Sequence, residues 1–168
     1  MAAASRKPIV PSVYLETTIP SYLVARLSPD GELAAKQAIT RSWWENHRHR
    51  YKLVTAEIVL SEAAKGDANA AGRRLEVLKD VVVLDSSERV DLIAEWLTGR
   101  GLVPVEAAAD AFHIGNAIVH EIDYLLTWNC THIANPTTRP KIEECLRREG
   151  MHVPTICTPE ELVRWNHD

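Results

Sequence analysis

The sequence predicts an α/β protein, a three-layer α/β/α sandwich with a central, mostly parallel five-stranded sheet flanked by helices. Short apolar segments alternate along the chain with longer segments whose apolar residues recur at helical spacing, a pattern that favours a parallel sheet covered on both faces. The length of 168 residues and the hydrophobic share of 46% suit one compact domain with its own core. We therefore expect a single domain over residues 1–168, with residues 1–11 as a loose N-terminal extension.

Five short segments have the composition of strands. They are residues 12–15, 51–54, 81–84, 123–127 and 153–157. The third of them is an unbroken β-branched run, which is typical of a strand buried in a parallel sheet.

Helices are expected between these strands, bounded by capping residues, prolines and glycines. They are residues 18–27, 28–47, 55–65, a helix from 67 past 78, then 87–99, 104–120, a helix after the 129–136 loop that ends at 150, and a final helix from 159. Ser28 and Thr55 are the expected caps of the second and third helices. Thr158 and Glu161 have the spacing of a capping box.

Composition excludes several classes of protein. The net charge of -4 argues against a globally basic nucleic-acid coat, so a nucleic-acid role requires a local site. Three widely spaced cysteines are not a disulfide framework and fit a reducing cytosol. No signal peptide or apolar run of spanning length is present, so we expect a cytoplasmic protein without a membrane segment.

Polar residues follow two of the predicted strands, where the functional crevice of such a sheet lies. Glu16 comes directly after the first strand, and Asn129 comes just past the fourth. A buried carboxylate is costly unless it faces a solvated crevice or a cation. If these two strands are neighbours, both side chains point into one crevice. An exposed acid at a strand end explains Glu16 about equally well.

Two further acids lie on predicted helices. Glu62 is on the helix after the second strand, where an exposed helix acid is an equally good reading. Asp110 is expected in the middle of an alanine-rich helix, where aspartate has poor propensity and little local justification. Glu16, Glu62, Asp110 and Asn129 together offer the oxygen ligands that Mg²⁺ prefers, and such an ion would activate water and neutralise charge on a phosphodiester.

Four short blocks carry a family resemblance. Glu16-Thr17-Thr18, the helix from Thr55 to Glu62, Asp110-Ala-Phe-His113-Ile and Leu126-Thr127-Trp128-Asn129 resemble, in this order, the signature blocks of the PIN-domain ribonucleases, which include the VapC-type toxins of toxin–antitoxin pairs. The resemblance covers roughly residues 12 to 160. It implies a PIN-like fold and a Mg²⁺- or Mn²⁺-dependent site that cuts single-stranded RNA.

The resemblance also implies roles for individual residues. Glu16, Glu62 and Asp110 would be the metal ligands, and Asn129 stands at the usual fourth acidic position as the remaining catalytic residue. Thr17, Thr127 and His113 would contact these residues instead of the ion. The family usually has Asp where Glu16 and Asn129 stand, which puts a second metal ion and strong activity in doubt. An antitoxin partner and a homodimer are implied as well.

Other readings stay open. The two departures favour, as the main alternative, a PIN-like domain that binds RNA or a protein without cutting. Cys130 and His132 are close in sequence and suggest a thiol nucleophile, although nothing visible orients the pair. A basic and aromatic run over residues 43–52 is either an RNA contact or a helix end with its tryptophans in the core. No glycine-rich phosphate loop follows the first strand, which disfavours a nucleotide-cofactor enzyme.

Overall fold

The computed structural model describes residues 9–164 and confirms the predicted fold class. Five strands form one fully parallel sheet in the order β3-β2-β1-β4-β5. The strands are β1 (Ser12–Leu15), β2 (Lys52–Ala56), β3 (Val82–Leu84), β4 (Tyr124–Leu126) and β5 (Thr155–Cys157). Most of the expected N-terminal extension, residues 1–8, lies outside the described residues.

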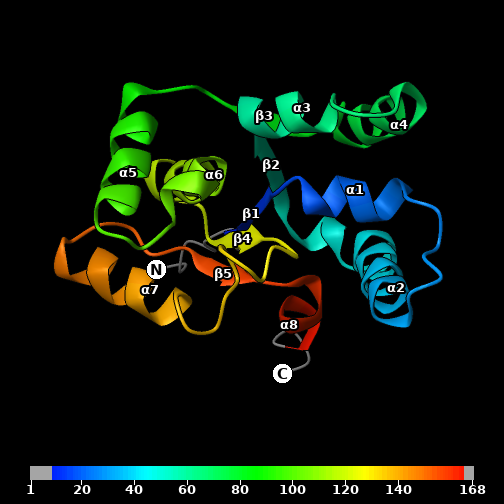
Figure 1. Cartoon of the computed structure of the whole chain (residues 1–168). Coiled ribbons are helices and arrows are strands. Elements are labelled where there is room, and N and C mark those ends of the chain that lie inside the picture. The colour runs from blue at the N-terminus through cyan, green and yellow to red at the C-terminus, as the bar shows by residue number, and fades with distance from the viewer. Residues whose placement is uncertain (1–8, 165–168) are drawn as a thin grey trace, which may run out of the picture.

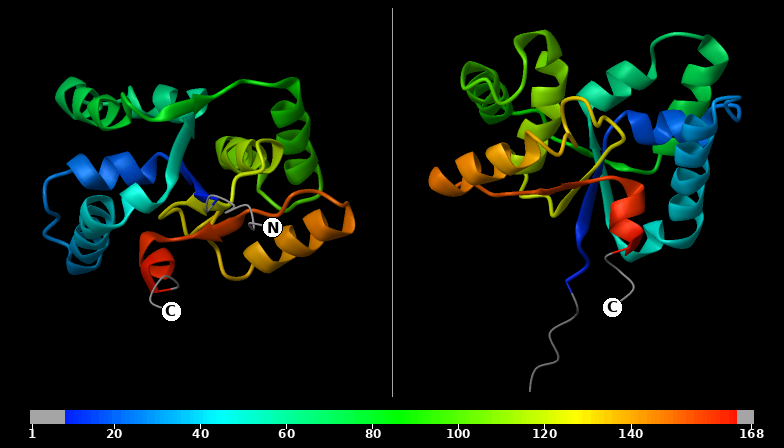
Figure 2. Two further views of the ribbon diagram at one scale, coloured as in Figure 1. Left: turned by 180° about the vertical axis from the view of Figure 1, so that it is seen from behind. Right: turned by 60° about the horizontal axis from the view of Figure 1, so that its bottom comes forward.

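Helices lie on both faces of this sheet. They are α1 (Thr18–Val24), α2 (Gly31–Asn46), α3 (Glu57–Ala63), α4 (Ala68–Leu78), α5 (Glu88–Gly99), α6 (Ala108–Val119), α7 (Arg139–Arg148) and α8 (Pro159–Arg164), with two short 3-10 turns, η1 (Arg48–Arg50) and η2 (Val105–Ala107). Figures 1 and 2 show α5, α6 and α7 on one side of the sheet and α1, α2, α4 and α8 on the other. The molecule therefore has the three predicted layers.

The strand order reverses between β1 and β4. The chain passes outward from β1 to β2 and β3, returns across the sheet, and then adds β4 and β5 on the other side of β1. Leu15 of β1 is in register with Leu126 of β4, and both are fully buried. The residues that follow these two positions therefore lie side by side at the point where ligands bind in sheets of this type.

The third strand differs from the prediction. The β-branched run was expected to be buried, but β3 pairs only with β2 and forms the edge of the sheet. Val82 is 53% exposed and Val83 is 37% exposed. The composition of this segment predicted a strand correctly. Its burial depends on where the strand lies in the sheet, and the segment's own residues do not determine that position.

Two of the expected helix caps are wrong. Asp30, and not Ser28, caps α2, because its carboxylate accepts a hydrogen bond from the backbone N–H of Leu33 at 2.8 Å. Thr55 belongs to β2, where its hydroxyl faces the carbonyl of Leu15, and α3 starts at Glu57 without a side-chain cap. The capping box of α8 is confirmed, since Thr158 and Glu161 each bond the other's backbone N–H.

The aromatic and basic run of residues 43–52 fits the packing interpretation. Trp43 is fully buried and lies in the core beside Tyr51, with ring centroids 6.1 Å apart. The guanidinium of Arg48 lies over the half-buried ring of Trp44, 4.6 Å from its centroid. Among the helices of residues 9–164, none combines the length and the apolar character that crossing a bilayer requires.

Candidate active site

The candidate site lies at the carboxyl edge of β1 and β4, and main-chain hydrogen bonds place its first two residues. The N–H of Glu16 donates to the carbonyl of Leu126 at 3.1 Å, and the N–H of Thr127 donates to the carbonyl of Cys157 at 3.0 Å. These bonds continue the parallel ladder by one residue beyond each strand. Glu16 and Thr127 are thereby held next to each other by the sheet itself.

Glu16 is buried and fully hydrogen-bonded on one oxygen. Its side chain is only 4% exposed. Oε2 accepts from the Thr18 N–H at 3.1 Å, the Thr18 hydroxyl at 2.5 Å and the Thr127 hydroxyl at 2.7 Å. A buried carboxylate is costly unless donors or a cation face it, and these three donors meet that need on one side only.

Glu62 reaches the same place from the last turn of α3. An acid is unfavourable there, because the helix C-terminus carries partial negative charge. The Thr17 hydroxyl donates to Glu62 Oε2, and His113 Nε2 lies 3.1 Å from the same oxygen. Burial raises the pKa of Glu62, but the hydrogen bonds from His113 and Thr17 outweigh it, so the pKa is lowered from its ordinary value. Glu62 is therefore a carboxylate at neutral pH.

Glu16 and Glu62 form a group suited to a divalent cation. One ligand atom each from Glu16, Glu62 and His113 lie within 4.8 Å of one another. Within residues 9–164, every hydrogen bond to the two side-chain carboxylates goes to Oε2, which leaves Oε1 of both without a donor. Two carboxylates at this spacing, each with an unbonded oxygen, fit a hard cation, which prefers oxygen ligands.

Asp110 lies outside this group and has different neighbours. Its Oδ1 accepts from the Asn129 amide at 3.0 Å, and its Oδ2 lies 2.8 Å from His132 Nδ1. In the part of the chain that is described, no group at the 4.8 Å spacing includes Asp110. A carboxylate offers about four lone-pair positions, so both oxygens of Asp110 can still accept a further partner.

Thr127 joins the two halves of the site. Its hydroxyl accepts from the N–H of Asn129 at 2.8 Å and donates to Glu16. Asn129 in turn donates to Asp110. The four residues predicted from sequence are thus connected in space. Glu16 and Glu62 form one group, and Asp110 is linked to Glu16 through Asn129 and Thr127.

The sequence argument for Asp110 is wrong in one respect. The stretch after Pro104 first forms the 3-10 turn η2, and α6 begins only at Ala108. Asp110 therefore lies in the first turn of α6, where the partial positive charge of the helix N-terminus favours an acid. Glu62, and not Asp110, is the acid that has no local structural reason for its position.

Two residues of the site were missed by sequence reasoning. Tyr14 is fully buried, and its hydroxyl lies 2.9 Å from His113 Nδ1. It stands two residues before Glu16, so strand alternation alone places it on the same face. His132 was read only as a partner of Cys130. Its N–H donates to Asn129 Oδ1 at 3.1 Å, the geometry of a capped turn that the i, i+3 spacing suggests.

The thiol alternative loses support. His132 uses Nδ1 to contact Asp110. Cys130 is exposed overall, but partial desolvation of its thiol raises the thiol's pKa, and the Lys36 ammonium lowers it by less. The thiolate that a nucleophile needs is therefore disfavoured. No further role for Cys130 follows.

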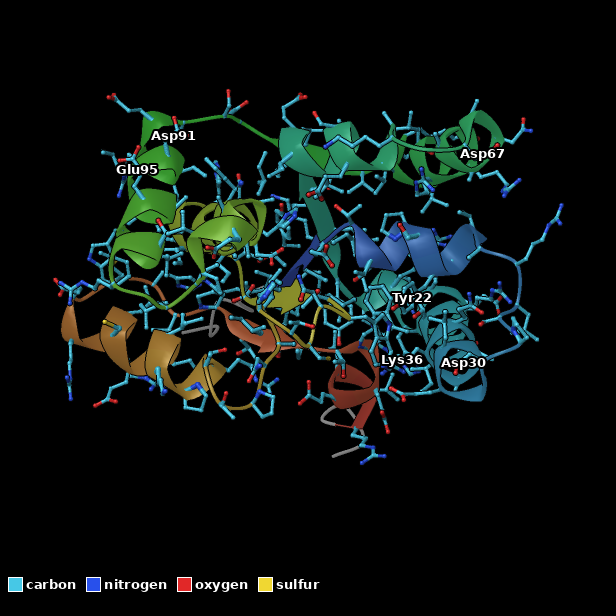
Figure 3. The ribbon with its side chains drawn as sticks, in the orientation of Figure 1. Tyr22, Asp30, Lys36, Asp67, Asp91 and Glu95 are labelled. Carbon is cyan, nitrogen blue, oxygen red and sulfur yellow. The ribbon has the colours of Figure 1, made fainter. Side chains whose placement is uncertain are left out.

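Trp128, which lies between Thr127 and Asn129, is buried. Trp128 donates its main-chain N–H to the Thr18 hydroxyl at 2.8 Å and its ring N–H to the Thr40 hydroxyl at 2.7 Å. Tyr22 of α1 stacks on the Trp128 ring with centroids 6.3 Å apart, and the Lys36 ammonium of α2 lies 5.9 Å from it. Figure 3 labels Tyr22 and Lys36 on these two helices. The packing anchors the segment that carries Thr127 and Asn129.

Comparisons with known proteins add little to this geometry. No protein-family model matches the chain, and no curated protein matches it. Among solved structures, it is similar to VapBC2 from Rickettsia felis bound to a DNA fragment from their promoter. That similarity has a TM-score of 0.48 at 14% identity and covers 87% of this chain and 97% of that chain. A likeness of this degree carries no argument about activity.

Proposed function

We propose that the protein is a metal-dependent endoribonuclease of the PIN type and the toxin of a type II toxin–antitoxin pair. The observation that supports this most is the convergence of Glu16, Glu62 and Asp110, which are distant in sequence, at one edge of a parallel sheet. Glu16 and Glu62 lie close together and, among the described residues, each has one oxygen without a donor, which is a costly arrangement for stability alone. It is the arrangement that a hard cation and a phosphodiester require.

In this proposal each residue has a role. Glu16 and Glu62 hold Mg²⁺ or Mn²⁺ through their unbonded oxygens, and Asp110 contributes directly or through water. When bound, such an ion polarises water and neutralises charge on the scissile phosphate. Asn129 orients Asp110, while Thr17, Thr127 and His113 orient the glutamates.

The reaction itself is a hydrolysis. Water forms the new P–O bond in line with the leaving oxygen, and the P–O bond to that oxygen breaks. One of the site carboxylates accepts the proton of the water, and the leaving oxygen takes a proton from solvent. The proposal includes single-stranded RNA as the substrate, one PIN-like domain over residues 1–168, a cytoplasmic location, an antitoxin that blocks the crevice, and a homodimer.

The first prediction concerns Asp110. Asp110→Asn keeps the shape of the side chain but removes its charge, so RNA cleavage should fall below detection while the melting temperature changes little. Cleavage is measured on labelled single-stranded RNA with Mg²⁺ or Mn²⁺. Asp91→Asn is the matched control. Asp91 and Asp110 both lie in the first turn of a helix, but Asp91 is exposed and lies outside the candidate site.

The outcomes separate the two functions that remain. Wild-type activity in Asp110→Asn contradicts the assignment of the site. Intact RNA after long incubation with wild-type protein favours the alternative, a PIN-like domain that binds RNA or a protein without cutting. One observation supports that alternative: both oxygens of Asp110 already have protein partners, Asn129 and His132.

A further inference from the structure

A buried hydrogen-bonded chain lies behind Glu62 and ends at Tyr14. The Tyr14 hydroxyl is 2.9 Å from His113 Nδ1, and His113 Nε2 is 3.1 Å from Glu62 Oε2. Tyr14 is completely buried and His113 is 1% exposed. The two rings meet edge to face, with centroids 5.9 Å apart and planes at 64°. Water therefore has little access to either nitrogen of the imidazole.

The two contacts fit one tautomer of a neutral imidazole. An ionised carboxylate only accepts hydrogen bonds, so Nε2 must carry the proton that reaches Glu62. In a neutral ring Nδ1 then has a lone pair, which requires a donor. The Tyr14 hydroxyl is that donor. The phenol group carries one proton, which it can donate in this contact.

We infer that Tyr14 is a positioning residue, which holds His113 in the Nε2–H tautomer and thereby aims the Glu62 carboxylate at a divalent cation. This inference rests on the proposed function and deepens it. Because Thr17 and His113 both bind Oε2, the carboxylate of Glu62 is fixed on one side and Oε1 remains open. Removal of the phenol hydroxyl leaves the buried Nδ1 lone pair without a partner, which costs free energy and frees the ring to turn.

The first test observes the tautomer without reference to activity. In protein labelled with ¹⁵N-histidine, two-bond ¹H–¹⁵N correlation spectra of metal-free protein should show His113 as one neutral species protonated at Nε2. Addition of Mg²⁺ should leave that proton in place. A ring protonated at Nδ1, or loss of the Nε2 proton on addition of Mg²⁺, would overturn the inference, since the second result makes His113 a ligand itself.

The second test compares Tyr14→Phe with Tyr124→Phe, the same change on the neighbouring strand β4. The readout is the Mn²⁺ concentration that gives half of the maximal thermal stabilisation. Loss of a residue that orients a metal ligand typically weakens metal affinity by roughly 10–100-fold, so Tyr14→Phe should raise this concentration about tenfold or more. Tyr124→Phe should leave it unchanged. If Tyr14→Phe lowers only the metal-free melting temperature, Tyr14 is a packing residue and the inference is wrong.

A pair of substitutions at His113 gives an independent check. The amide of His113→Gln can still donate to Glu62, whereas His113→Leu cannot. The glutamine variant should therefore keep a Mn²⁺ midpoint closer to wild type than the leucine variant. Equal midpoints contradict the inference. Wild-type protein that is stabilised by Mn²⁺ but leaves RNA intact contradicts only the proposed nuclease, and wild-type protein that Mn²⁺ does not stabilise contradicts both.

Discussion

Single hydroxyl groups hold the candidate site together. Thr127, which is fully buried, donates to Glu16 and accepts from the N–H of Asn129, so one hydroxyl bridges the two strand ends. The Thr18 hydroxyl has the same double role, since it donates to Glu16 and accepts from the N–H of Trp128. A hydroxyl can do both because it has one proton and two lone pairs. These threonines allow a carboxylate to remain buried where the sheet ends.

The residue-scale prediction concerns this bridge. Thr127→Val keeps the shape of the side chain but leaves Glu16 and the Asn129 N–H each with one partner fewer. The cost should be about 1–3 kcal/mol in the free energy of unfolding, measured by urea denaturation. Thr55→Val is the matched control, because Thr55 is equally buried but makes only a long 3.4 Å bond to the carbonyl of Leu15. The interpretation fails if the two variants lose the same stability.

Among the helices, α6 contributes both Asp110 and His113 to the candidate site, and it packs closely against α5. A Cβ at Gly115 would lie 3.2 Å from the carbonyl oxygen of Val90, so this glycine permits the close approach of the two helices. His113 lies two residues before Gly115, on a different face of α6, where it contacts Glu62 and Tyr14. The distance between α5 and α6 therefore bears on the alignment of the site.

A glycine pair tests this packing. Gly72 of α4 has open space around its Cβ position, so Gly72→Ala should stabilise the protein by up to about 1 kcal/mol through helix propensity. Gly115→Ala gains the same propensity but must move the carbonyl of Val90. It should therefore stabilise less than Gly72→Ala, or destabilise, in thermal and urea unfolding. An equal gain at both positions would show that α5 and α6 separate without cost.

At the scale of the whole molecule, the site is a product of topology. β1 and β4 are far apart in sequence, yet the crossover after β3 makes them neighbours in the sheet. Glu62 comes from a helix after β2, and Asp110 from a helix that precedes β4. No local segment could assemble these charges, and their repulsion opposes folding unless a cation neutralises it.

Cation binding should therefore appear as stability of the entire domain. Once Mn²⁺ saturates the site, each further tenfold rise in its concentration should add about 1.4 kcal/mol to the free energy of unfolding, by mass action. Glu62→Gln should remove this dependence. Glu57→Gln, an exposed glutamate at the start of the same helix, should retain it. If the free energy of unfolding of the wild-type protein does not change with Mn²⁺ concentration, these residues do not form a cation site.

The residue order is enough to predict the alternation of strands and helices, and hence the fold class and the edge of the sheet where the candidate site lies. The positions of Glu16 and Asn129 just past two strands are also visible in the residue order, whereas Glu62 and Asp110 were selected mainly through the family resemblance. The alternation of strands and helices depends on periodicities of two and 3.6 residues, which are local properties of the chain.

The burial and the hydrogen-bond partners of each residue became visible only in the folded molecule. The order of strands, and not the composition of β3, left its valines exposed at the sheet edge. The onset of α6 after a 3-10 turn changed the environment of Asp110. The partners of the site, such as Tyr14 with His113, are separated by 99 residues in sequence. Hydrogen bonds and burial are pairwise and long-range, so no local pattern can specify them before the sheet has formed.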